Sequence, residues 1–174
     1  MPTIRPLLPG DNDDDWARVY ELQCRVYPPE WHEDVPVLRQ KATVGNGFCF
    51  LYQDQGELMG YCLAHPWASG QVPKLNAVVK EATAPVTTDN LFLHDLAVAT
   101  PKQGIGKRLF QHLQQQQQQQ QVQPNKGRIK SMSLVAVNGS HSFWTKLGFQ
   151  RATPLDPECL QSYGSDAAFM VLSL

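Results

Sequence analysis

The sequence predicts a mixed α/β (α+β) fold in one domain that spans residues 1–174. Three observations support this fold class. Strand-like and helix-like patterns alternate along the chain. The segment Leu91–Val98 is largely apolar, as expected of a central strand that is covered on both faces. A glycine turn and an amphipathic helical pattern follow that strand directly, so we expect a central sheet flanked by helices.

Composition and charge exclude several classes of protein. The chain has 15 Lys and Arg against 16 Asp and Glu, which argues against a nucleic-acid partner and against polybasic binding to a membrane. No apolar stretch approaches the roughly 18 residues of a membrane span, and the N-terminus lacks the layout of a signal peptide. The four cysteines are scattered without a CxxC pair, so neither a disulfide scaffold nor a metal site is expected. Free cysteines are typical of a cytoplasmic protein.

The N-terminal segment is predicted to hold one strand and two helices. Thr3–Leu7 is strand-like. The acidic run Asp11–Asp15 then supplies N-cap choices and negative charge at the start of a helix that ends before Pro28. A second helix is expected over Val35–Thr43, with Pro36 in its first turn.

A β-hairpin and a long loop are expected next. The aromatic segment Gly47–Tyr52 and the segment Leu58–His65 read as two strands, joined by a turn over Asp54–Glu57. Pro66 is expected to end the second strand. Residues 66–90 show little periodicity, and a loop of this length in a compact domain is often a lid or a binding loop.

The second half begins with the strand Leu91–Val98 and a helix whose apolar residues Ile105, Leu109 and Leu113 recur every four positions. Eight consecutive glutamines, Gln114–Gln121, continue this helix. Because glutamine is a fair helix former but polar, we interpret the run as an exposed extension of the helix.

Three more elements complete the expected fold. Ile129–Val137 is strand-like, Asn138–Leu147 reads as a short helix, and Ala167–Leu174 is apolar enough to form a final strand. Gly148 follows the short helix, at the position where a left-handed cap is expected.

The glycine turn after Leu91–Val98 has the properties of an anion site. A strand that turns directly into a helix aims free backbone N–H groups and the positive end of the helix dipole at one point. Gly104 and Gly106 allow a phosphate to approach the backbone, and Lys102, Lys107 and Arg108 add positive charge. The alternative is a turn that needs two glycines for packing alone. Neither GxxxxGK[ST] nor a complete GxGxxG is present.

Two segments in order resemble the signatures of the GNAT superfamily of acyl-CoA N-acyltransferases. Leu96–Val98 followed by Gln103–Leu109 resembles the acyl-CoA pyrophosphate loop of that family. Val135–Phe149 resembles its second signature, in which a strand, an Asn, a short helix with an aromatic pair and Gly-Phe follow one another. The N-terminal helices and the hairpin also fall where the family has them, so the resemblance covers nearly the whole chain.

The resemblance implies a sheet that is splayed open between Leu91–Val98 and Ile129–Val137, with acetyl-CoA in the cleft. Backbone groups of the first strand would bond the pantetheine arm, and amides of the glycine turn would hold the pyrophosphate. Asn138 would cap its helix and touch the cofactor, although an N-cap is a sufficient role by itself. The implied cofactor-binding residues are Leu96, Ala97, Val98, Gln103, Gly104, Ile105, Gly106, Lys107, Arg108 and Asn138.

Two features depart from the family pattern. The loop between Val98 and Gly104 is about two residues shorter than is usual in the family, and Pro101 stands where the family has Arg or Gln, so Gln103 is the expected substitute. Trp144 stands where the family often has the Tyr that protonates the leaving thiolate, and an indole N–H is too weak an acid for that role.

The pair His94-Asp95 is the best candidate for the chemistry. Adjacent residues of a strand point to opposite faces, so we do not expect both to face the cleft. Relatives that acetylate polyamines carry acidic residues here, which favours Asp95 as the general base. The alternative is that Asp95 bridges neighbouring loops and His94 packs on the other face. Tyr163 is the candidate acid, and its alternative role is a packed aromatic in a turn.

The expected activity is direct transfer of an acetyl group from acetyl-CoA to a primary amine of a small molecule or protein, by a monomer or homodimer. Direct transfer is favoured because no cysteine adjoins the motifs. One alternative is a catalytically poor acyl-CoA-binding or sensing module on the same fold, suggested by Trp144. Another is an interaction protein whose glutamine run assembles partners.

Overall fold

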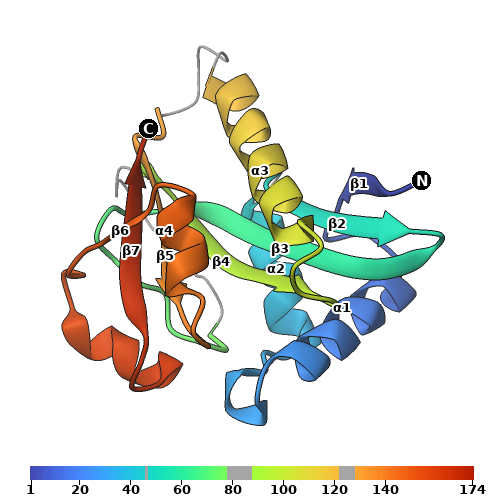
Figure 1. The fold of residues 1–174 in the computed structure, drawn as a ribbon, viewed down its shortest axis with the longest axis horizontal. Coiled ribbons are helices and arrows are strands. Elements are labelled where there is room, and N and C mark those ends of the chain that lie inside the picture. The colour runs from blue at the N-terminus through green and yellow to red at the C-terminus, as the bar shows by residue number, and fades with distance from the viewer. Residues whose placement is uncertain (46, 78–87, 122–127) are drawn as a thin grey trace.

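The computed structural model describes residues 1–45, 47–77, 88–121 and 128–174. Seven strands form one mixed sheet in the order β1-β2-β3-β4-β5-β7-β6, with helices on both faces (Figure 1), which confirms the predicted fold class. The strands are β1 (Thr3–Pro6), β2 (Cys49–Asp54), β3 (Glu57–Trp67), β4 (Asn90–Val98), β5 (Ser131–Ala136), β6 (Gln150–Arg151) and β7 (Ala168–Ser173). The helices are α1 (Asp13–Val26), α2 (Val35–Gly45), α3 (Ile105–Gln121), α4 (His141–Lys146) and the 3-10 helices η1 (Pro29–Trp31) and η2 (Pro157–Tyr163).

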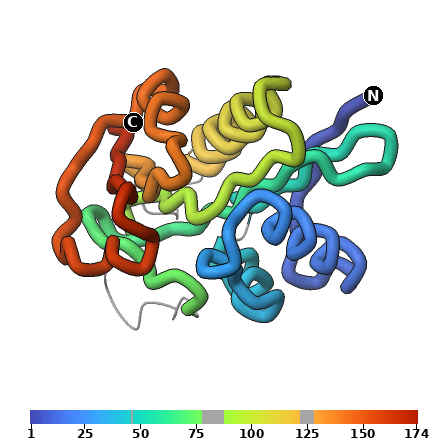
Figure 2. Tube along the Cα trace, turned by 60° about the horizontal axis from the view of Figure 1, so that its bottom comes forward, coloured from blue at the N-terminus to red at the C-terminus, as the bar shows by residue number. Residues whose placement is uncertain are grey.

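The sheet separates two hydrophobic cores. Helices α1 and α2 lie on one face, and α3 and α4 lie on the other (Figure 2). The first core packs Trp16, Val19 and Leu38 against residues of β2 and β3 such as Leu51 and Tyr61. The second core packs α3 and α4 against the opposite side chains of the same strands. Side chains of β2 and β3 alternate between the two cores, so both faces of the hairpin are buried.

Strands β4 and β5 are parallel and pair only over their first residues. Their register runs from Asn90 opposite Ser131 to Phe92 opposite Ser133, and it ends there. Beyond that point β4 continues beside β3, and β5 continues beside β7. The sheet is therefore splayed open between the two strands for which the sequence predicted it.

A β-bulge in β4 corrects one expectation about the site. Asp95 lies opposite Leu63 and Leu93 lies opposite Ala64, so His94 is an extra residue with no partner of its own in β3. A bulge of this kind interrupts the alternation of side chains between the two faces. As a result His94 and Asp95 both face the side of α1 and α2, and the prediction that they point to opposite faces is wrong.

Two predicted boundaries are also wrong. Pro66 does not end β3, because it pairs opposite Leu91 and the strand continues to Trp67. The short helix begins at His141 rather than at residue 138, and its N-cap is Ser140. Asn138 therefore does not cap the helix; it adopts a left-handed conformation with φ of 53°.

The glutamine run is less exposed than its composition suggests. It continues α3 over the edge of the sheet, so its inward positions follow Leu113 on the buried face. The side chain of Gln117 is only 3% exposed, and Gln121 Nε2 donates to the carbonyl oxygen of Ile129 at 2.5 Å. The prediction of an exposed extension is wrong for Gln117, because the helical period places it on the buried face after Leu113, whereas Gln121 is exposed.

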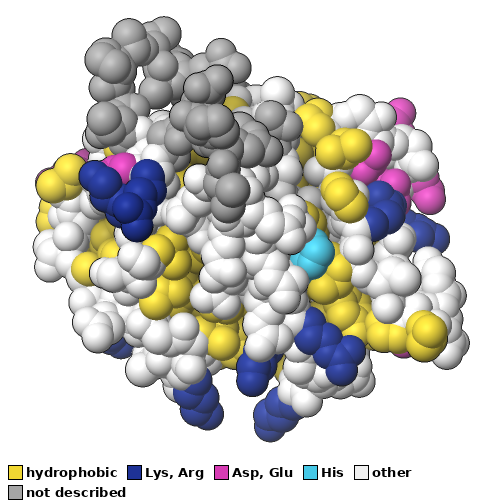
Figure 3. Space-filling view, turned by 90° about the horizontal axis from the view of Figure 1, so that it is seen from above, with side chains coloured by type: hydrophobic (Ala, Val, Ile, Leu, Met, Phe, Trp, Pro, Cys, Tyr) yellow, Lys and Arg dark blue, Asp and Glu magenta, His cyan; other side chains and the backbone are white. Residues whose placement is uncertain are grey.

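Three kinds of feature matter for the described residues: charged patches, membrane-spanning helices and metal-binding clusters. On the face drawn in Figure 3, Lys and Arg side chains are spread along the edges and form no single patch. None of the helices in the described ranges is long and apolar enough to cross a membrane. Within the same ranges no three His, Cys, Asp or Glu side chains form a group that could hold a metal ion. All four cysteines are free thiols.

Candidate active site

A cavity of about 640 Å³ opens where β4 and β5 diverge. Its walls come from β4, β5, the N-terminus of α3, helix α4, the segments around η1 and η2, and Leu75. We call the part next to α3 the helix end, lined by Lys102, Gly104, Ile105, Gly106 and Lys107. We call the part formed with η1 and η2 the acidic end, lined by Tyr27, Trp31, Glu33, Leu75, His94, Asp95 and Tyr163.

The helix end has the backbone geometry that suits an anion. Gly104 has φ of 75°, a conformation that suits glycine, and it turns the chain into the first residue of α3. The first amides of a helix have no partner within it, and the helix dipole adds partial positive charge. A Cβ on Gly106 would lie 3.2 Å from Phe143 Cζ, so glycine lets α3 begin this close to α4 without displacing the Phe143 ring. Lys102 and Lys107 add charge beside these amides.

The structure divides the ten predicted cofactor-binding residues into two groups. Those that line the cavity are Leu96, Val98, Gly104, Ile105, Gly106, Lys107 and Asn138. Three do not line it. Ala97 is buried in the opposite core, Gln103 is exposed, and the Arg108 guanidinium donates to the Tyr52 hydroxyl at 2.9 Å. Ala97 faces the other core because successive side chains of a strand point to opposite faces of the sheet. Arg108 points toward the sheet because of its position in the first turn of α3.

Trp144 fills the position that carries a Tyr acid in many relatives. Its side chain lines the cavity but is only 6% exposed. Its ring contacts Phe110, Phe143 and Phe149 edge-on, with centroids 6.1, 4.8 and 5.5 Å away. The residue therefore packs the cavity wall against the core of α3, and its role is hydrophobic.

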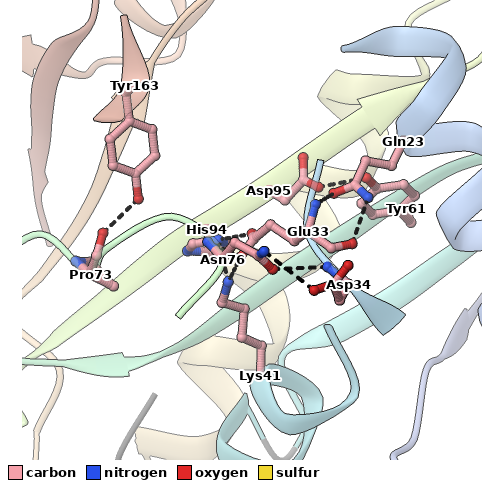
Figure 4. A network of polar contacts seen from close by, with 10 residues as sticks. All are labelled: Gln23, Glu33, Asp34, Lys41, Tyr61, Pro73, Asn76, His94, Asp95 and Tyr163. Carbon is pink, nitrogen blue, oxygen red and sulfur yellow. Dashed lines mark hydrogen bonds and ion pairs between the residues drawn. The ribbon is translucent and has the colours of Figure 1, made fainter. Parts of the chain in front are cut away.

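Asp95 is held by two tyrosines at the acidic end. Tyr27 donates to Oδ1 at 2.8 Å and Tyr61 donates to Oδ2 at 2.5 Å (Figure 4 shows Tyr61). Burial raises the pKa of Asp95, and the two hydroxyl donors oppose part of that rise. A carboxylate has about four acceptor positions, so two remain for a ligand. Asp95 is thus an oriented carboxylate whose pKa is shifted toward that of a useful base.

Beside Asp95 lies a buried cluster that sequence reasoning missed. Glu33 contacts both Lys41 Nζ and His94 Nε2, and Lys41 Nζ lies 2.8 Å from His94 Nε2 (Figure 4). The side chains of Glu33 and Lys41 are 2% and 0% exposed. Burial would raise the pKa of Glu33, but His94 and Lys41 outweigh it and hold the pKa at about 2. Burial lowers the pKa of Lys41, and Glu33 opposes this.

The cluster also anchors the loop that closes the acidic end. The Gln23 side chain donates to the Glu33 carbonyl and accepts from the Glu33 N–H, both at 3.0 Å, so the backbone of Glu33 is fixed. The Asn76 N–H donates to Glu33 Oε2 at 2.9 Å. Tyr163 donates to the Pro73 carbonyl at 2.7 Å, and burial raises the pKa of this tyrosine well above its ordinary value. All three predicted catalytic residues, Asp95, Tyr163 and His94, line the same cavity.

The signals that could have revealed this cluster were weak. Lys41 lies at helical spacing from Leu38 and Gly45, on the buried face of α2, where a lysine is unusual. Glu33 read as ordinary charge before a helix. Nothing local in the sequence indicates that these two residues pair with each other and with His94.

Similar solved structures have the same fold at low sequence identity. The ribosomal-protein-S18-alanine N-acetyltransferase from Escherichia coli superposes with a TM-score of 0.64 at 18% identity, covering 99% of this chain and 94% of that one. The loading GNATL domain of CurA from Lyngbya majuscula superposes with a TM-score of 0.72 at 9% sequence identity, covering 99% of this chain and 98% of that one. Arabidopsis thaliana Naa50, in complex with the bisubstrate analogue CoA-Ac-MVNAL, superposes with a TM-score of 0.62 at 14% sequence identity, covering 99% of each chain.

A search of curated protein sequences finds no significant match. The family model described as the acetyltransferase (GNAT) family does match, over residues 16–149. That range contains the glycine turn, the splayed strands and the Gly-Phe that follows α4. The chain therefore belongs to the acetyltransferase (GNAT) family.

Proposed function

We propose that this protein is a cytoplasmic, single-domain N-acetyltransferase that moves the acetyl group of acetyl-CoA directly to a primary amine of a small molecule or protein. One observation carries the proposal: a single cavity joins an anion-binding helix end to an oriented, buried carboxylate. Family membership and the Naa50 complex with a CoA-containing analogue support the choice of donor.

In this proposal the helix end binds the donor. Amides of Gly104, Ile105, Gly106 and Lys107 hold the pyrophosphate. The edge of β4 beyond Phe92 has no β5 neighbour, so the backbone of Leu96 and Val98 can bond the pantetheine arm. Lys102 takes the position we had given to Gln103, since it lines the cavity and Gln103 does not.

Asp95 is the proposed general base. An amine arrives as an ammonium ion, and one of its protons passes to the Asp95 carboxylate, directly or through water. The neutral nitrogen attacks the thioester carbon, forming the N–C bond, and backbone N–H groups of β4 stabilise the oxyanion. Collapse of the tetrahedral intermediate breaks the C–S bond. The second proton leaves the nitrogen and neutralises the thiolate, while the proton held by Asp95 returns to solvent.

We assign Tyr163 to the wall of the site, in place of the acid role that its position in the sequence suggested. Its hydroxyl already donates to the Pro73 carbonyl, and burial raises its pKa, so it holds its proton firmly. A thiol has an ordinary pKa near ~8.5, so the thiolate is a good leaving group without a dedicated acid. This assignment fits the hydrophobic role of Trp144.

Acetyl-CoA is expected to stabilise the protein against heat. At 100 times the dissociation constant a ligand adds about 2.7 kcal/mol, which corresponds to a rise in Tm of about 5–10 °C for a chain of this size. A thermal-shift titration with acetyl-CoA measures this rise in Tm, and pantetheine, which lacks the phosphates of CoA, is the matched control. No stabilisation at millimolar acetyl-CoA would overturn the proposed function. Thiol release that needs an added amine then separates an enzyme from the sensing module.

Gly106→Val is expected to weaken acetyl-CoA binding at least 10-fold. A branched side chain here would collide with Phe143 and push α3 away from α4, which misplaces the amides of the helix end. Gly10→Val is the matched control, because no atom lies within 4 Å of a Cβ at that position. Calorimetric titration of both variants with acetyl-CoA tests this, and equal affinities would contradict the assigned pyrophosphate site.

A further inference from the structure

The charges that line the cavity differ sharply between its two ends. Among the described residues that line it, the only lysines are Lys102 and Lys107, both at the helix end, and no arginine lines it. The acidic end is lined by two carboxylate residues. Glu33 is paired with Lys41 and His94, whereas Asp95 accepts from the hydroxyls of Tyr27 and Tyr61. A ligand that spans the cavity therefore meets lysines at one end and the Asp95 carboxylate at the other.

Lys41, which lies behind the acidic end, cannot serve an incoming anion. Lys41 has no exposed side-chain surface, it contacts the Glu33 carboxylate, and it does not line the cavity. Its charge is already balanced by Glu33, so a second carboxylate would have to compete with a buried ion pair. Trp31 supplies an indole that is neutral and cannot offset the charge of a carboxylate.

Leu75 lines the cavity together with Asp95 and Glu33, and its place in the wall is fixed. The residues on either side of it are anchored, because the Pro73 carbonyl accepts from Tyr163 and the Asn76 N–H donates to Glu33. The loop therefore holds Leu75 in the lining, where a basic residue would be needed to pair with an anionic substrate. Tyr27 and Trp31 line the same end, so an apolar or aromatic body next to the amine has rings to pack on.

We propose that the acceptor is a primary amine with an apolar or aromatic body and no carboxylate beside its amino group, such as an alkylamine, an arylalkylamine or the N-terminus of a peptide. This inference rests on the proposed function. A free amino acid would bring its carboxylate within reach of Asp95. The described residues that line the cavity there include no Lys or Arg to pair with it, His94 is already in contact with Glu33, and like charges strongly disfavour binding. Leu75 is the residue that sets this selectivity, since it fills the wall position from which a cation could pair with that carboxylate.

Three acceptors that share one skeleton test the proposal: 2-phenylethylamine, phenylalanine amide and phenylalanine. We expect kcat/KM, measured by thiol release, to be at least ~10-fold lower for phenylalanine than for phenylalanine amide. The amide is the decisive comparison because it keeps the size of phenylalanine and removes the negative charge of its carboxylate. Equal use of the acid and the amide would overturn the proposal, as would acetylation of the acid alone.

A specificity swap gives the second arm. Leu75→Arg is expected to raise the acid-to-amide ratio of kcat/KM at least ~10-fold, because it supplies the missing cation. Leu75→Gln, of similar length without charge, is expected to leave the ratio unchanged. An acid-to-amide ratio of kcat/KM that shifts equally in both variants, or in neither, would contradict the role of Leu75. If Leu75→Arg fails to fold, the same ratio measured in the wild-type protein remains the test. Absence of acetyl-CoA binding would instead reject the proposed function, whereas binding without use of any of the three amines would reject the acceptor class.

Discussion

Asp95→Asn is expected to lower kcat/KM for the amine by about 10²- to 10⁴-fold, the usual contribution of a general base. The amide keeps the shape of the carboxylate and can still contact Tyr27 and Tyr61, but it cannot take a proton. Affinity for acetyl-CoA is expected to change little, because the proposed donor site lies at the helix end. Steady-state thiol release and a binding titration measure the two quantities separately.

The pH profile gives this prediction its sign. The base acts in its ionised form, so activity is present above the pKa of Asp95 and is lost as pH falls through it. Burial raises that pKa, so the acidic limb of kcat/KM is expected above the ordinary carboxyl range near ~4. The limb should vanish in Asp95→Asn. Asp89→Asn is the matched control, since Asp89 lies just before β4 and outside the cavity lining. Unchanged turnover in Asp95→Asn would reject Asp95 as the base.

Lys41→Met is expected to destabilise the protein by about 3–5 kcal/mol, because it leaves the Glu33 carboxylate buried without its lysine partner. For a chain of this size that is a fall in Tm of about 6–20 °C. The exposed Lys130 offers a matched control. Its side chain is 69% exposed and lies 3.8 Å from Asp89, so Lys130→Met should cost no more than about 1 kcal/mol. Urea unfolding of the two variants measures the difference.

The double variant Lys41→Met/Glu33→Gln separates the charge from the packing. Removing both charges is expected to recover most of the lost stability, because a buried ion pair is worth little more than well-packed neutral groups. Activity is expected to stay low in the double variant, because His94 and the loop at Asn76 lose their common partner. If Lys41→Met and Lys130→Met destabilise equally, Lys41 is not the buried counter-ion described here.

The sequence could predict the fold and the helix end because both depend on residues close together in the chain. An apolar strand, Gly104 and an amphipathic helix succeed one another, and their geometry follows from local backbone preferences. The order of the two family signatures then located the split between β4 and β5. Arg108 and Ala97 do not line the cavity for a different reason: which way a side chain turns depends on its partners across the sheet.

The acidic end was decided by tertiary structure. The sequence by itself determined that His94 and Asp95 are neighbours on a central strand, but only pairing with β3 creates the bulge that turns both side chains to one face. Glu33 and Lys41 are 61 and 53 residues from His94, and they meet it because η1 and α2 pack on the same face of β4. Pairing at such separations depends on how the elements dock, and no local pattern encodes it. Local preference therefore determined where the anion site lies, and packing decided which charges stand at the opposite end of the cavity.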